Sequence, residues 1–566
     1  MKTSCLDKVC VKERGMHNYS YYCTEGIGLT IDVMTNNYAG YITGWSLSTK
    51  DNDYSGTTRQ ELLDTLRMLC KHFDIKRRDE NSKDILLIFT DNLNKVIGFF
   101  EHLITDDFNG RYVRLCHNIE VRPMVWNEAL TTSRDIADYA QWMIDNVFIP
   151  DKYFYLTPNQ IPRRKVMHNC DSDIAKNLFP NSSTEYYALR KALFGGLCYC
   201  PYPGKVIDEP MIEIDLTSAY IYCMLIEKHC MSEALEVNPN DWEYYLDSNS
   251  KASIGSYEIT YGCTTRMARC YKDIYGNRID IVDDGKLATS RMVLTSIDLK
   301  ILMSILNIIS IKCVNLCEYT LEYLPKYFMD VIVEEYTKKN KLKGGDKRAY
   351  KLQKSITNGL YGDTIRKLGI SREEWKAAKK TAVIAPQWGI FTTSYCKRLL
   401  ISMARKLDGW NYSDTDSIYC LDTPENRAKI DKFNSEIREK VINFCYEREY
   451  NPDDLIGLGE FKLEAEIVKF KAIQTKCYMY KTKDGEMVLK AAGCDKESIP
   501  LNEALFKADR IPVGRRVFPR FNPEHTECEV DGKHYVSDGS YYEMILNDEA
   551  AEAYIYFLMM LDNEDN

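Results

Sequence analysis

Two short segments of the chain have the alternation of apolar and polar residues expected of strands that carry carboxylates. Residues 211–216, with the sequence MIEIDL, predict a buried strand that delivers Asp215. Residues 412–417, with the sequence YSDTDS, place Asp414 and Asp416 one residue apart. Successive side chains of a strand point to opposite faces, so an extended backbone would turn these two aspartates the same way. The two segments therefore predict three carboxylates on neighbouring strands.

Carboxylates in this arrangement predict a site for hard divalent cations, which take oxygen ligands. Taken alone, residues 412–417 fit a solvated Asp-rich turn equally well. The separate strand that carries Asp215 favours the metal site, because three carboxylates on neighbouring strands match what two-metal phosphoryl or nucleotidyl transfer needs.

The rest of the pattern predicts several domains, as does the length of 566 residues. Up to about residue 185, short apolar strands alternate with helical stretches, which is typical of an α/β layer domain. The interval between Asp215 and Lys354 is far longer than a simple connection and predicts an inserted subdomain. Beyond about residue 485, short strands and an amphipathic helix at 548–561 form a third region. Within the insert we expect strands near 253–263 and helices at 296–309 and 324–340.

Composition places the chain among ordinary globular proteins, with 45% hydrophobic and 28% charged residues. No apolar run approaches the roughly 20 residues of a membrane span, and the first residues lack the apolar stretch of a signal peptide. The 20 cysteines form no CxxC pair, which argues against structural zinc and a disulfide framework. We therefore expect reduced thiols, a cytoplasmic protein and no membrane partner.

Charge is unevenly distributed, although the net charge is −9. Residues 338–380 contain fourteen Lys or Arg and four Asp or Glu, and local basic surface is what attracts phosphates. A solvated helical face is the ordinary alternative. Within this stretch, Lys354, Asn358 and Tyr361 share one face of a predicted helix, and Lys347 and Lys351 extend that stripe. An ammonium group, an amide and a ring together suit a nucleotide.

These segments resemble the polymerase motifs of family B DNA polymerases. Residues 215–220, DLTSAY, are similar to the first motif, D-x-x-S-L-Y-P. Residues 354–362, KSITNGLYG, are similar to the second, K-x-x-x-N-S-x-Y-G. Residues 412–417 match the third, Y-x-D-T-D-S, without change. Three positions beside the expected ligands depart from the motifs, namely Ala219, Ile221 and Gly359.

Shorter segments extend the resemblance to the protein-primed polymerases of phages. Residues 194–196, FGG, are similar to the Y-x-G-G element that joins their exonuclease and polymerase parts. Thr393 and Lys397 stand at the key places of a segment similar to their T-x-x-A-R template contact. Residues 476–478 match K-x-Y, and residues 490–493 are similar to K-x-A-G at the thumb entry.

The resemblance implies an α/β and α+β multidomain protein with the right-hand architecture of palm, fingers and thumb, preceded by an RNase H-like domain of the exonuclease type. The implied divisions are an exonuclease-like domain at 1–188, a palm at 189–235 and 386–484, an insert at 236–336, fingers at 337–385, and a thumb and C-terminal segment at 485–566. In this group the insert contacts the priming protein and DNA.

The resemblance also implies roles in catalysis. Asp215 and Asp416 would hold two Mg²⁺ ions, for which Mn²⁺ can substitute, with the Leu216 carbonyl as a further ligand. Asp414 would be an auxiliary carboxylate, and Lys354 would neutralise the triphosphate in the transition state.

Nucleotide and DNA contacts follow from the same motifs. Tyr220 would lie under the incoming sugar, where it leaves no room for a ribose 2′-hydroxyl. The implied partners are a DNA template and primer, deoxynucleoside triphosphates and a terminal protein that primes synthesis. The wider nucleotide site would comprise Ser218, Ala219, Lys347, Arg348, Lys351, Asn358 and Tyr361. The DNA contacts would be Gly195, Gly196, Thr393, Lys397, Lys476 and Tyr478.

Two regions depart from the resemblance. In the exonuclease part, the alignment uses Asp32, Asn92 and Asp135, but Met34 and Val96 stand where carboxylates should be. Apolar side chains supply no oxygen ligands, so we expect a retained fold with an inactive or weak site. The second region is the connection from 362 to 386, which is short. Its SREEWK sequence at 371–376 predicts a helix start, so the hairpin that relatives carry there is expected to be reduced or replaced.

Alternatives remain open beside a phage replicase in the cytoplasm of an infected cell. One is a primer-independent or repair-type family B polymerase with the same palm. Another is a retired polymerase that serves as a DNA-binding subunit. That alternative suits a degenerate exonuclease, but it does not explain the intact motif residues, which are Asp215, Asp414, Asp416, Lys354 and Lys476.

We predict no appreciable 3′–5′ exonuclease activity on single-stranded DNA, because apolar residues occupy two of the metal-ligand positions. Gel analysis of an end-labelled oligonucleotide with Mg²⁺ checks this. Shortening that disappears in Asp32→Ala or Asp135→Ala would show that the aligned site is active after all.

Overall fold

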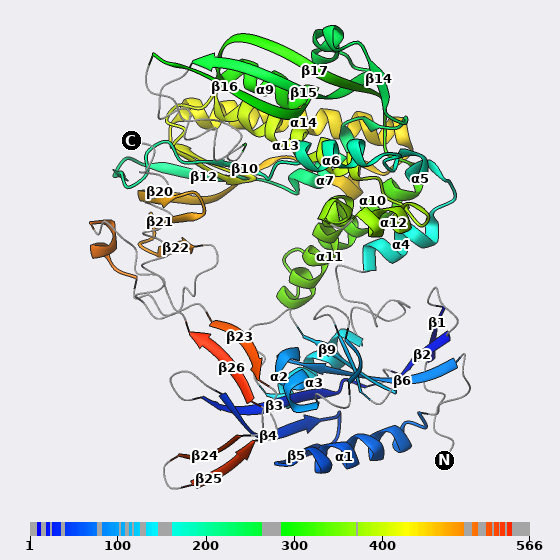
Figure 1. The fold of residues 1–566 in the computed structure, drawn as a ribbon. Helices are drawn as coiled ribbons and strands as arrows, with labels where there is room; N and C mark the ends of the chain where they lie inside the picture. Colours follow the sequence, from blue (N-terminus) through cyan, green and yellow to red (C-terminus); the bar gives the residue numbers. More distant parts are fainter. Residues whose placement is uncertain are drawn as a thin grey trace. The chain divides into compact units, whose positions relative to one another are not determined.

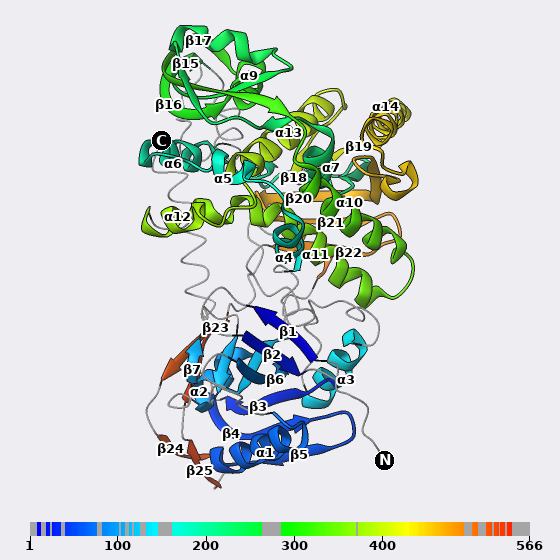
Figure 2. The same ribbon diagram turned by 90° about the vertical axis from the view of Figure 1, so that its right-hand side faces the viewer.

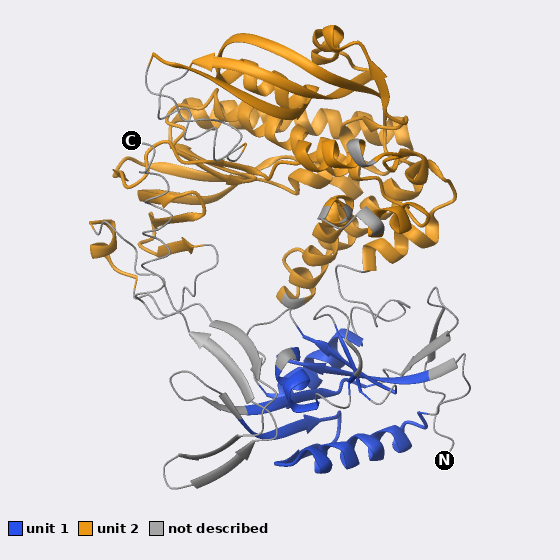
Figure 3. Ribbon diagram, in the orientation of Figure 1, with its two compact units in different colours: residues 1–157, 515–555 blue, residues 158–514, 556–566 orange. Residues whose placement is uncertain are grey.

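The chain divides into two compact units (Figure 3). Unit 1 comprises residues 1–157 and 515–555, and unit 2 comprises residues 158–514 and 556–566. Each unit has its own hydrophobic core. The computed structural model describes residues 8–12, 18–22, 25–35, 40–75, 82–100, 104–107, 112–115, 118–124, 132–144, 161–262, 275, 285–369, 372–491, 501–507, 517–522, 526–530, 533–537 and 540–545.

Unit 1 is built on a mixed sheet of 11 strands. The strands are β1 (Lys8–Lys12), β2 (Asn18–Tyr22), β3 (Gly28–Thr35), β4 (Gly40–Ser48), β5 (Asp53–Gly56), β6 (Ser82–Thr90), β7 (Ile104–Asp107), β8 (Val113–Leu115), β9 (Ile119–Pro123), β23 (Val517–Asn522) and β26 (Ser540–Ile545). The main order is β23-β26-β4-β3-β6-β9-β8-β7 (Figure 1). β6 pairs in parallel with both β3 and β9, while β3 and β4 are antiparallel.

Three helices accompany this sheet, as the alternating pattern predicted. They are α1 (Arg59–His72), α2 (Leu93–Phe100) and α3 (Ser133–Met143). Leu62, Leu66 and Leu69 of α1 recur at helical spacing and are buried in the core of unit 1. α3 approaches β3 so closely that a Cβ at Gly28 would lie 2.1 Å from the Ser133 carbonyl oxygen. This contact leaves room for glycine alone.

Strands near the C-terminus belong to unit 1. β26 pairs with β23 and also with β4. β24 (Thr526–Val530) and β25 (Lys533–Ser537) form a separate hairpin. The range 485–566, expected as one thumb and C-terminal segment, is therefore divided at residue 515, and its assignment as a thumb stays a prediction. The helix expected at 548–561 lies outside the described residues.

Unit 2 contains an antiparallel sheet of eight strands. They are β10 (Leu197–Tyr199), β11 (Val206–Ile207), β12 (Met211–Leu216), β18 (Tyr412–Thr415), β19 (Ser417–Leu421), β20 (Phe461–Gln474), β21 (Cys477–Thr482) and β22 (Met487–Ala491). The order is β10-β18-β19-β12-β20-β21-β22, with β11 beside β20. β12 is central, so Ile212, Ile214 and Leu216 enter the helical core while Glu213 and Asp215 are half-buried on the other face.

A second antiparallel sheet occupies the interval expected for the insert. Its strands are β13 (His229–Cys230), β14 (Leu235–Val237), β15 (Lys251–Gly262), β16 (Leu287–Thr295) and β17 (Asn307–Glu322), and α9 (Ser296–Ile305) packs against it. The helix expected at 296–309 ends at Ile305. Residues from Asn307 onward instead pair with β15 along the whole length of that strand.

The remaining helices of unit 2 lie over one side of the central sheet and beyond one end of it in the view of Figure 1. They are α4 (Ile161–Asn169), α5 (Ile174–Leu178), α6 (Ser183–Ala192), α7 (Ala219–Ile226), α10 (Lys326–Lys341), α11 (Lys347–Ile365), α12 (Arg372–Lys379), α13 (Pro386–Ala404) and α14 (Pro424–Arg448). Short 3₁₀ segments lie at Pro239–Leu246, Arg366–Gly369, Pro452–Leu455 and Glu503–Phe506. None of the helices described for either unit is long and apolar enough to cross a membrane.

α12 is a helix, as the SREEWK sequence predicted, and it lies beside α5 and α6 (Figure 2). Trp375 holds it there, because its ring stacks on Tyr186 at 5.6 Å and on Phe179 at 6.3 Å between centroids. Aromatic pairs at this separation stabilise a contact beyond the area they bury.

Candidate active site

The C-terminal end of β12 brings Asp215 beside the turn that carries Asp416. Asp215 pairs with Ser417 in the register of β12 and β19. The Leu216 N–H donates to the Asp416 carbonyl oxygen over 2.9 Å. One ladder of backbone hydrogen bonds therefore fixes both aspartates at the same end of the central strand.

The expectation of an extended backbone through Asp414 and Asp416 was wrong, because the chain turns between them. Asp414 pairs with Ser417, and the Asp416 N–H donates to the Asp414 carbonyl oxygen over 2.8 Å. Thr415 has a φ of 63°, a left-handed conformation that β-branched residues rarely adopt. Tight hairpin loops commonly need such a conformation. The turn places Asp416 close enough to Asp215 for their charges to repel, while the charge of Asp414 also acts on Asp416.

Burial and repulsion raise the pKa values of both aspartates. The pKa of Asp215 rises to about 7, first because the carboxyl group is buried and then because Asp416 and Glu464 repel its charge. The pKa of Asp416 rises to about 6, again first through burial, while Lys354 opposes the rise. Ionising both groups near neutral pH therefore costs free energy that a bound cation would offset.

The donor set fits Mg²⁺ completed by water and substrate. Mg²⁺ is usually held by one or two carboxylates together with waters and substrate phosphates. Asp215 and Asp416 supply two carboxylates, whereas Asp414 accepts from Lys476 Nζ over 2.8 Å. Within the described part of the chain, no group of three or more His, Cys, Asp or Glu side chains is placed to hold an ion. The metal, and the role of the Leu216 carbonyl, stay predictions.

Glu464 is a carboxylate that the sequence analysis did not single out. It lies on β20, beside β12, and its charge contributes to the raised pKa of Asp215. It also accepts from Lys462 Nζ over 2.7 Å. The spacing of two residues between Lys462 and Glu464 on a strand could be seen in the sequence. The pairing of β20 with β12, which brings Glu464 near Asp215, could not.

The lysines expected to bind phosphate lie on α11. Lys347, Lys351 and Lys354 are exposed, as is Asn358. Lys354 lies close enough to both aspartates to oppose the rise in their pKa values. The side chain of Arg348 lies outside the described part of the structure.

Lys339 of α10 is a further cation at the site that the sequence analysis missed. It is 6% exposed, and its Nζ donates to Ser218 Oγ. Burial, with added repulsion from Lys354 and Lys343, lowers its pKa to about 8, whereas the charge of Asp215 opposes this shift. In sequence Lys339 is one lysine among several on a basic helix, and only packing shows that it turns inward.

Two predicted nucleotide-site tyrosines form one packed layer. Tyr220 and Tyr361 stack with centroids 4.0 Å apart and an angle of 5° between the rings. The Tyr361 hydroxyl lies 2.6 Å from Thr393 Oγ1. Ala219, at the start of α7, is buried in the helical core.

The two glycines expected to contact DNA differ in their surroundings. A Cβ at Gly196 would lie 2.9 Å from Thr415 Cγ2 and 3.0 Å from the Tyr220 hydroxyl. A Cβ at Gly195 would meet nothing within 4 Å. Internal packing therefore accounts for the glycine at position 196 without reference to DNA.

Two predicted template contacts need correction. Thr393 and Lys397 are each 1% exposed. Lys397 Nζ lies 2.6 Å from Asp298 Oδ1 and within 4.9 Å of the ring centroids of Phe194 and Tyr275. We therefore assign both side chains to the interior, where no phosphate can reach them.

Lys476 and Tyr478, both expected to contact DNA, also differ in their surroundings. Lys476 has a φ of 60°, and its N–H donates to the Tyr412 hydroxyl over 2.6 Å while its ammonium group pairs with Asp414. Tyr478 is 4% exposed, and its hydroxyl lies 2.9 Å from that of Tyr419. Lys476 remains a candidate for DNA contact, whereas Tyr478 packs inside the sheet.

The aligned exonuclease residues are dispersed over three elements. Val96 is fully buried in the core of unit 1, and the side chain of Met34 lies outside the described residues. The pKa of Asp32 is raised, first by burial, and nearby Asp91 adds to the rise. The other aligned residues are Asn92, directly before α2, and Asp135, in the first turn of α3.

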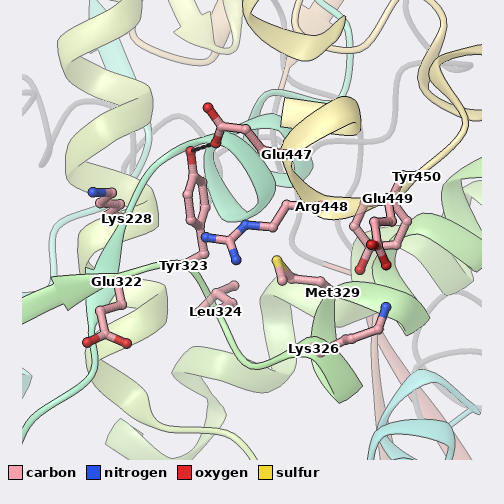
Figure 4. Close-up of a pocket in the computed structure, with 10 residues that line it drawn as sticks. All are labelled: Lys228, Glu322, Tyr323, Leu324, Lys326, Met329, Glu447, Arg448, Glu449 and Tyr450. Carbon is pink, nitrogen blue, oxygen red and sulfur yellow. Dashed lines mark hydrogen bonds between the residues drawn. The ribbon is translucent and has the colours of Figure 1, made fainter. Parts of the chain in front are cut away.

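A cavity of about 650 Å³ lies elsewhere in unit 2 (Figure 4). The Arg448 guanidinium carbon lies 4.1 Å from the centroid of the Tyr323 ring. Three basic and three acidic side chains share the lining, so it has no excess positive charge for a triphosphate. None of the predicted site residues lines it. The lining residues are Lys228, Glu322, Tyr323, Leu324, Lys326, Met329, Glu447, Arg448, Glu449 and Tyr450.

Comparison with solved structures decides the fold. Phi29 DNA polymerase bound to primer-template DNA superposes with a TM-score of 0.60 over 92% of this chain and 99% of that one, at 12% identity. The fold resembles that of phi29 DNA polymerase. Its complex with primer-template DNA and incoming nucleotides gives 0.58 at 12% identity, and its complex with single-stranded DNA gives 0.57 at 13% identity, with the same coverage. No family model and no curated sequence matches the chain.

We predict that Lys397→Met lowers the free energy of unfolding of unit 2 by about 3–5 kcal/mol, because it leaves the charge of buried Asp298 without its partner. Denaturant unfolding measures this change. Lys429→Met is the control, since its partner Asp408 is largely exposed and such pairs contribute under about 1 kcal/mol. Equal losses in the two variants would contradict the interior role of Lys397.

Proposed function

We propose that the protein is a DNA-directed DNA polymerase of the protein-primed phage type, which adds deoxynucleotides to a 3′ hydroxyl. The observation that carries the proposal is the placement of Asp215 and Asp416 side by side at the end of the central strand. Two half-buried carboxylates that repel each other suit a cation site better than a structural pair. The fold, shared with phi29 DNA polymerase over 92% of the chain, supports the same activity.

Each site residue would have a distinct task. Asp215 and Asp416 would hold two Mg²⁺ ions, for which Mn²⁺ can substitute. These ions would supply a lowered pKa at the primer hydroxyl and positive charge for the triphosphate and the leaving pyrophosphate. Lys354, from the exposed face of α11, and Lys339, from beside Ser218, would add positive charge around the phosphates. No proton transfer by the lysines is needed for this role.

Nucleotide selection and DNA binding would involve residues around the two aspartates. The Tyr220 ring, fixed by its stack on Tyr361, would leave no room for a ribose 2′-hydroxyl. The basic stretch 338–380 and Lys476 would bind the phosphates of template and primer, contacts that position without reading sequence. A terminal protein as the primer, and the loss of 3′–5′ exonuclease activity, are parts of the same proposal. Complexes of phi29 DNA polymerase with primer-template DNA and nucleotides support the choice of partners.

The alternatives differ in observable ways. A repair-type or primer-independent polymerase would extend DNA without a terminal protein. A retired polymerase would bind DNA without incorporating nucleotides. The arrangement of Asp215, Asp416 and Lys354 favours an active enzyme, because a site without function has no reason to retain buried carboxylates that cost stability.

Asp416→Ala and Asp215→Ala are each expected to reduce Mg²⁺-dependent primer extension by several orders of magnitude. Loss of a metal ligand removes several kcal/mol of transition-state stabilisation. Asp422→Ala is the matched control, because Asp422 follows β19 and its carboxylate pairs with the side chain of Arg427 at 2.6 Å. Near-normal incorporation by both ligand variants would refute the proposal.

Tyr220→Val is expected to raise CTP insertion relative to dCTP by at least about tenfold, a typical effect of opening or closing space for one small group. Single-nucleotide insertion on a primed template with each substrate measures the ratio. Tyr220→Phe keeps the ring and its stack on Tyr361, so it should retain the wild-type ratio. An unchanged ratio in Tyr220→Val would place the steric barrier on another residue.

A further inference from the structure

α4 is the first described helix of unit 2, and it lies against both α10 and α11 (Figures 1 and 2). α10 and α11 are the helices that carry Lys339 and Lys354, two lysines whose charges interact with that of Asp215. The contact therefore links the segment that follows unit 1 to the elements that deliver positive charge to the candidate site. None of the polymerase motifs includes a residue of α4.

A buried lysine forms the centre of this contact. Lys165 of α4 is 7% exposed, and its Nζ lies 2.6 Å from Glu335 Oε1 and 3.1 Å from Glu334 Oε1. Glu335 is 1% exposed. Burial acts to lower the pKa of Lys165, but the attraction and hydrogen bond of Glu335 outweigh it and raise the pKa above its usual value. Lys165 therefore carries its positive charge at neutral pH.

Glu335 of α10 also forms hydrogen bonds with α11. Its second carboxylate oxygen accepts from Gln353 Nε2 over 2.7 Å, and its backbone carbonyl accepts from Gln353 Nε2 and Thr357 Oγ1, each over 3.2 Å. One carboxylate thus receives bonds from α4 and α11 while it stands on α10. Charge-assisted hydrogen bonds of this kind are strong and directional, so they fix how the three helices lie against one another.

The network adjoins the nucleotide lysines in sequence and in space. Glu335 precedes Lys339 by four residues, which places the two on one face of α10. Gln353 immediately precedes Lys354 on α11. A rotation or shift of either helix at the network would therefore displace the corresponding ammonium group from the carboxylates.

We propose that Lys165 is a positioning residue for nucleotide binding: through Glu335 and Gln353 it holds Lys339 and Lys354 where the triphosphate of the incoming nucleotide lies. The inference rests on the proposed polymerase function. It adds a residue outside the polymerase motifs to those on which nucleotide binding depends. Lys165 touches neither substrate nor metal. Its effect falls mainly on the KM for the nucleotide, because the lysines it places would bind phosphate already in the ground state as well as in the transition state.

Lys165→Met is the primary test, in single-nucleotide insertion on a primed template with Mg²⁺. We expect KM for the deoxynucleotide to rise about tenfold or more, as small misplacements of binding groups typically do, with a smaller change in kcat and unchanged affinity for primer-template DNA. KM does not depend on the fraction of active enzyme, so partial unfolding alone leaves it unchanged. Lys165→Arg, which keeps the cation, should restore much of the wild-type KM.

A second variant separates positioning from stability. In Lys165→Met the buried charge of Glu335 keeps only the longer contact with Lys338 Nζ, at 3.7 Å, among its described ion pairs. Adding Glu335→Gln removes that charge, so stability should recover toward wild type. If positioning is the role, KM stays high in this double variant, because α4 no longer bonds to α10. Recovery of both stability and KM would overturn the inference.

Lys176→Met serves as the matched control, since Lys176 lies half-buried on α5 and pairs with the exposed Asp173, away from the contact of α4 with α10. It should leave KM, kcat and stability unchanged. A wild-type protein without any nucleotide incorporation would refute the polymerase proposal itself. An active wild type whose KM is unaffected by Lys165→Met would refute the positioning role alone.

Discussion

The antiparallel pairing of β12 with β19 is the constraint on which the candidate site depends. It sets Asp215 opposite Ser417 and joins the Leu216 N–H to the Asp416 carbonyl. Two carboxylates that repel each other cannot bring themselves together, so the free energy of sheet formation must hold them there. The apolar side chains of β12 on the opposite face anchor the strand in the large core of unit 2. The core thereby stabilises a charge arrangement that is unfavourable by itself.

Sequence alone predicted the strand at 211–216, the basic helix around Lys354 and the helix after residue 371, because each depends on local periodicity and capping. The turn in YSDTDS was predicted wrongly. Alternation along an extended strand was assumed, whereas the pairing of Tyr412 with Tyr419 closes a hairpin at Thr415 and Asp416. A left-handed threonine has no signal in a single sequence, since its conformation is imposed by the flanking strands.

Residues that act through packing were the hardest to predict. Lys339 and Lys397 look like surface lysines in the sequence, yet both are buried. Lys397 finds Asp298 across more than ninety positions, and no periodicity connects them. Glu464 reaches the site only because β20 lies beside β12. The exposed residues of the motifs could be predicted from their spacing in the sequence. The residues that hold them in place could not, because they depend on contacts between distant segments.

The contact between Gly196 and the side chain of Thr415 has an evolutionary consequence. The methyl group of Thr415 fills the space that a Cβ at position 196 would need. The two positions therefore share one volume, although Gly196 lies directly before β10 and Thr415 lies at the end of β18, far away in sequence. A larger residue at 196 would be tolerated only with a smaller one at 415, so substitutions at this pair should be strongly epistatic.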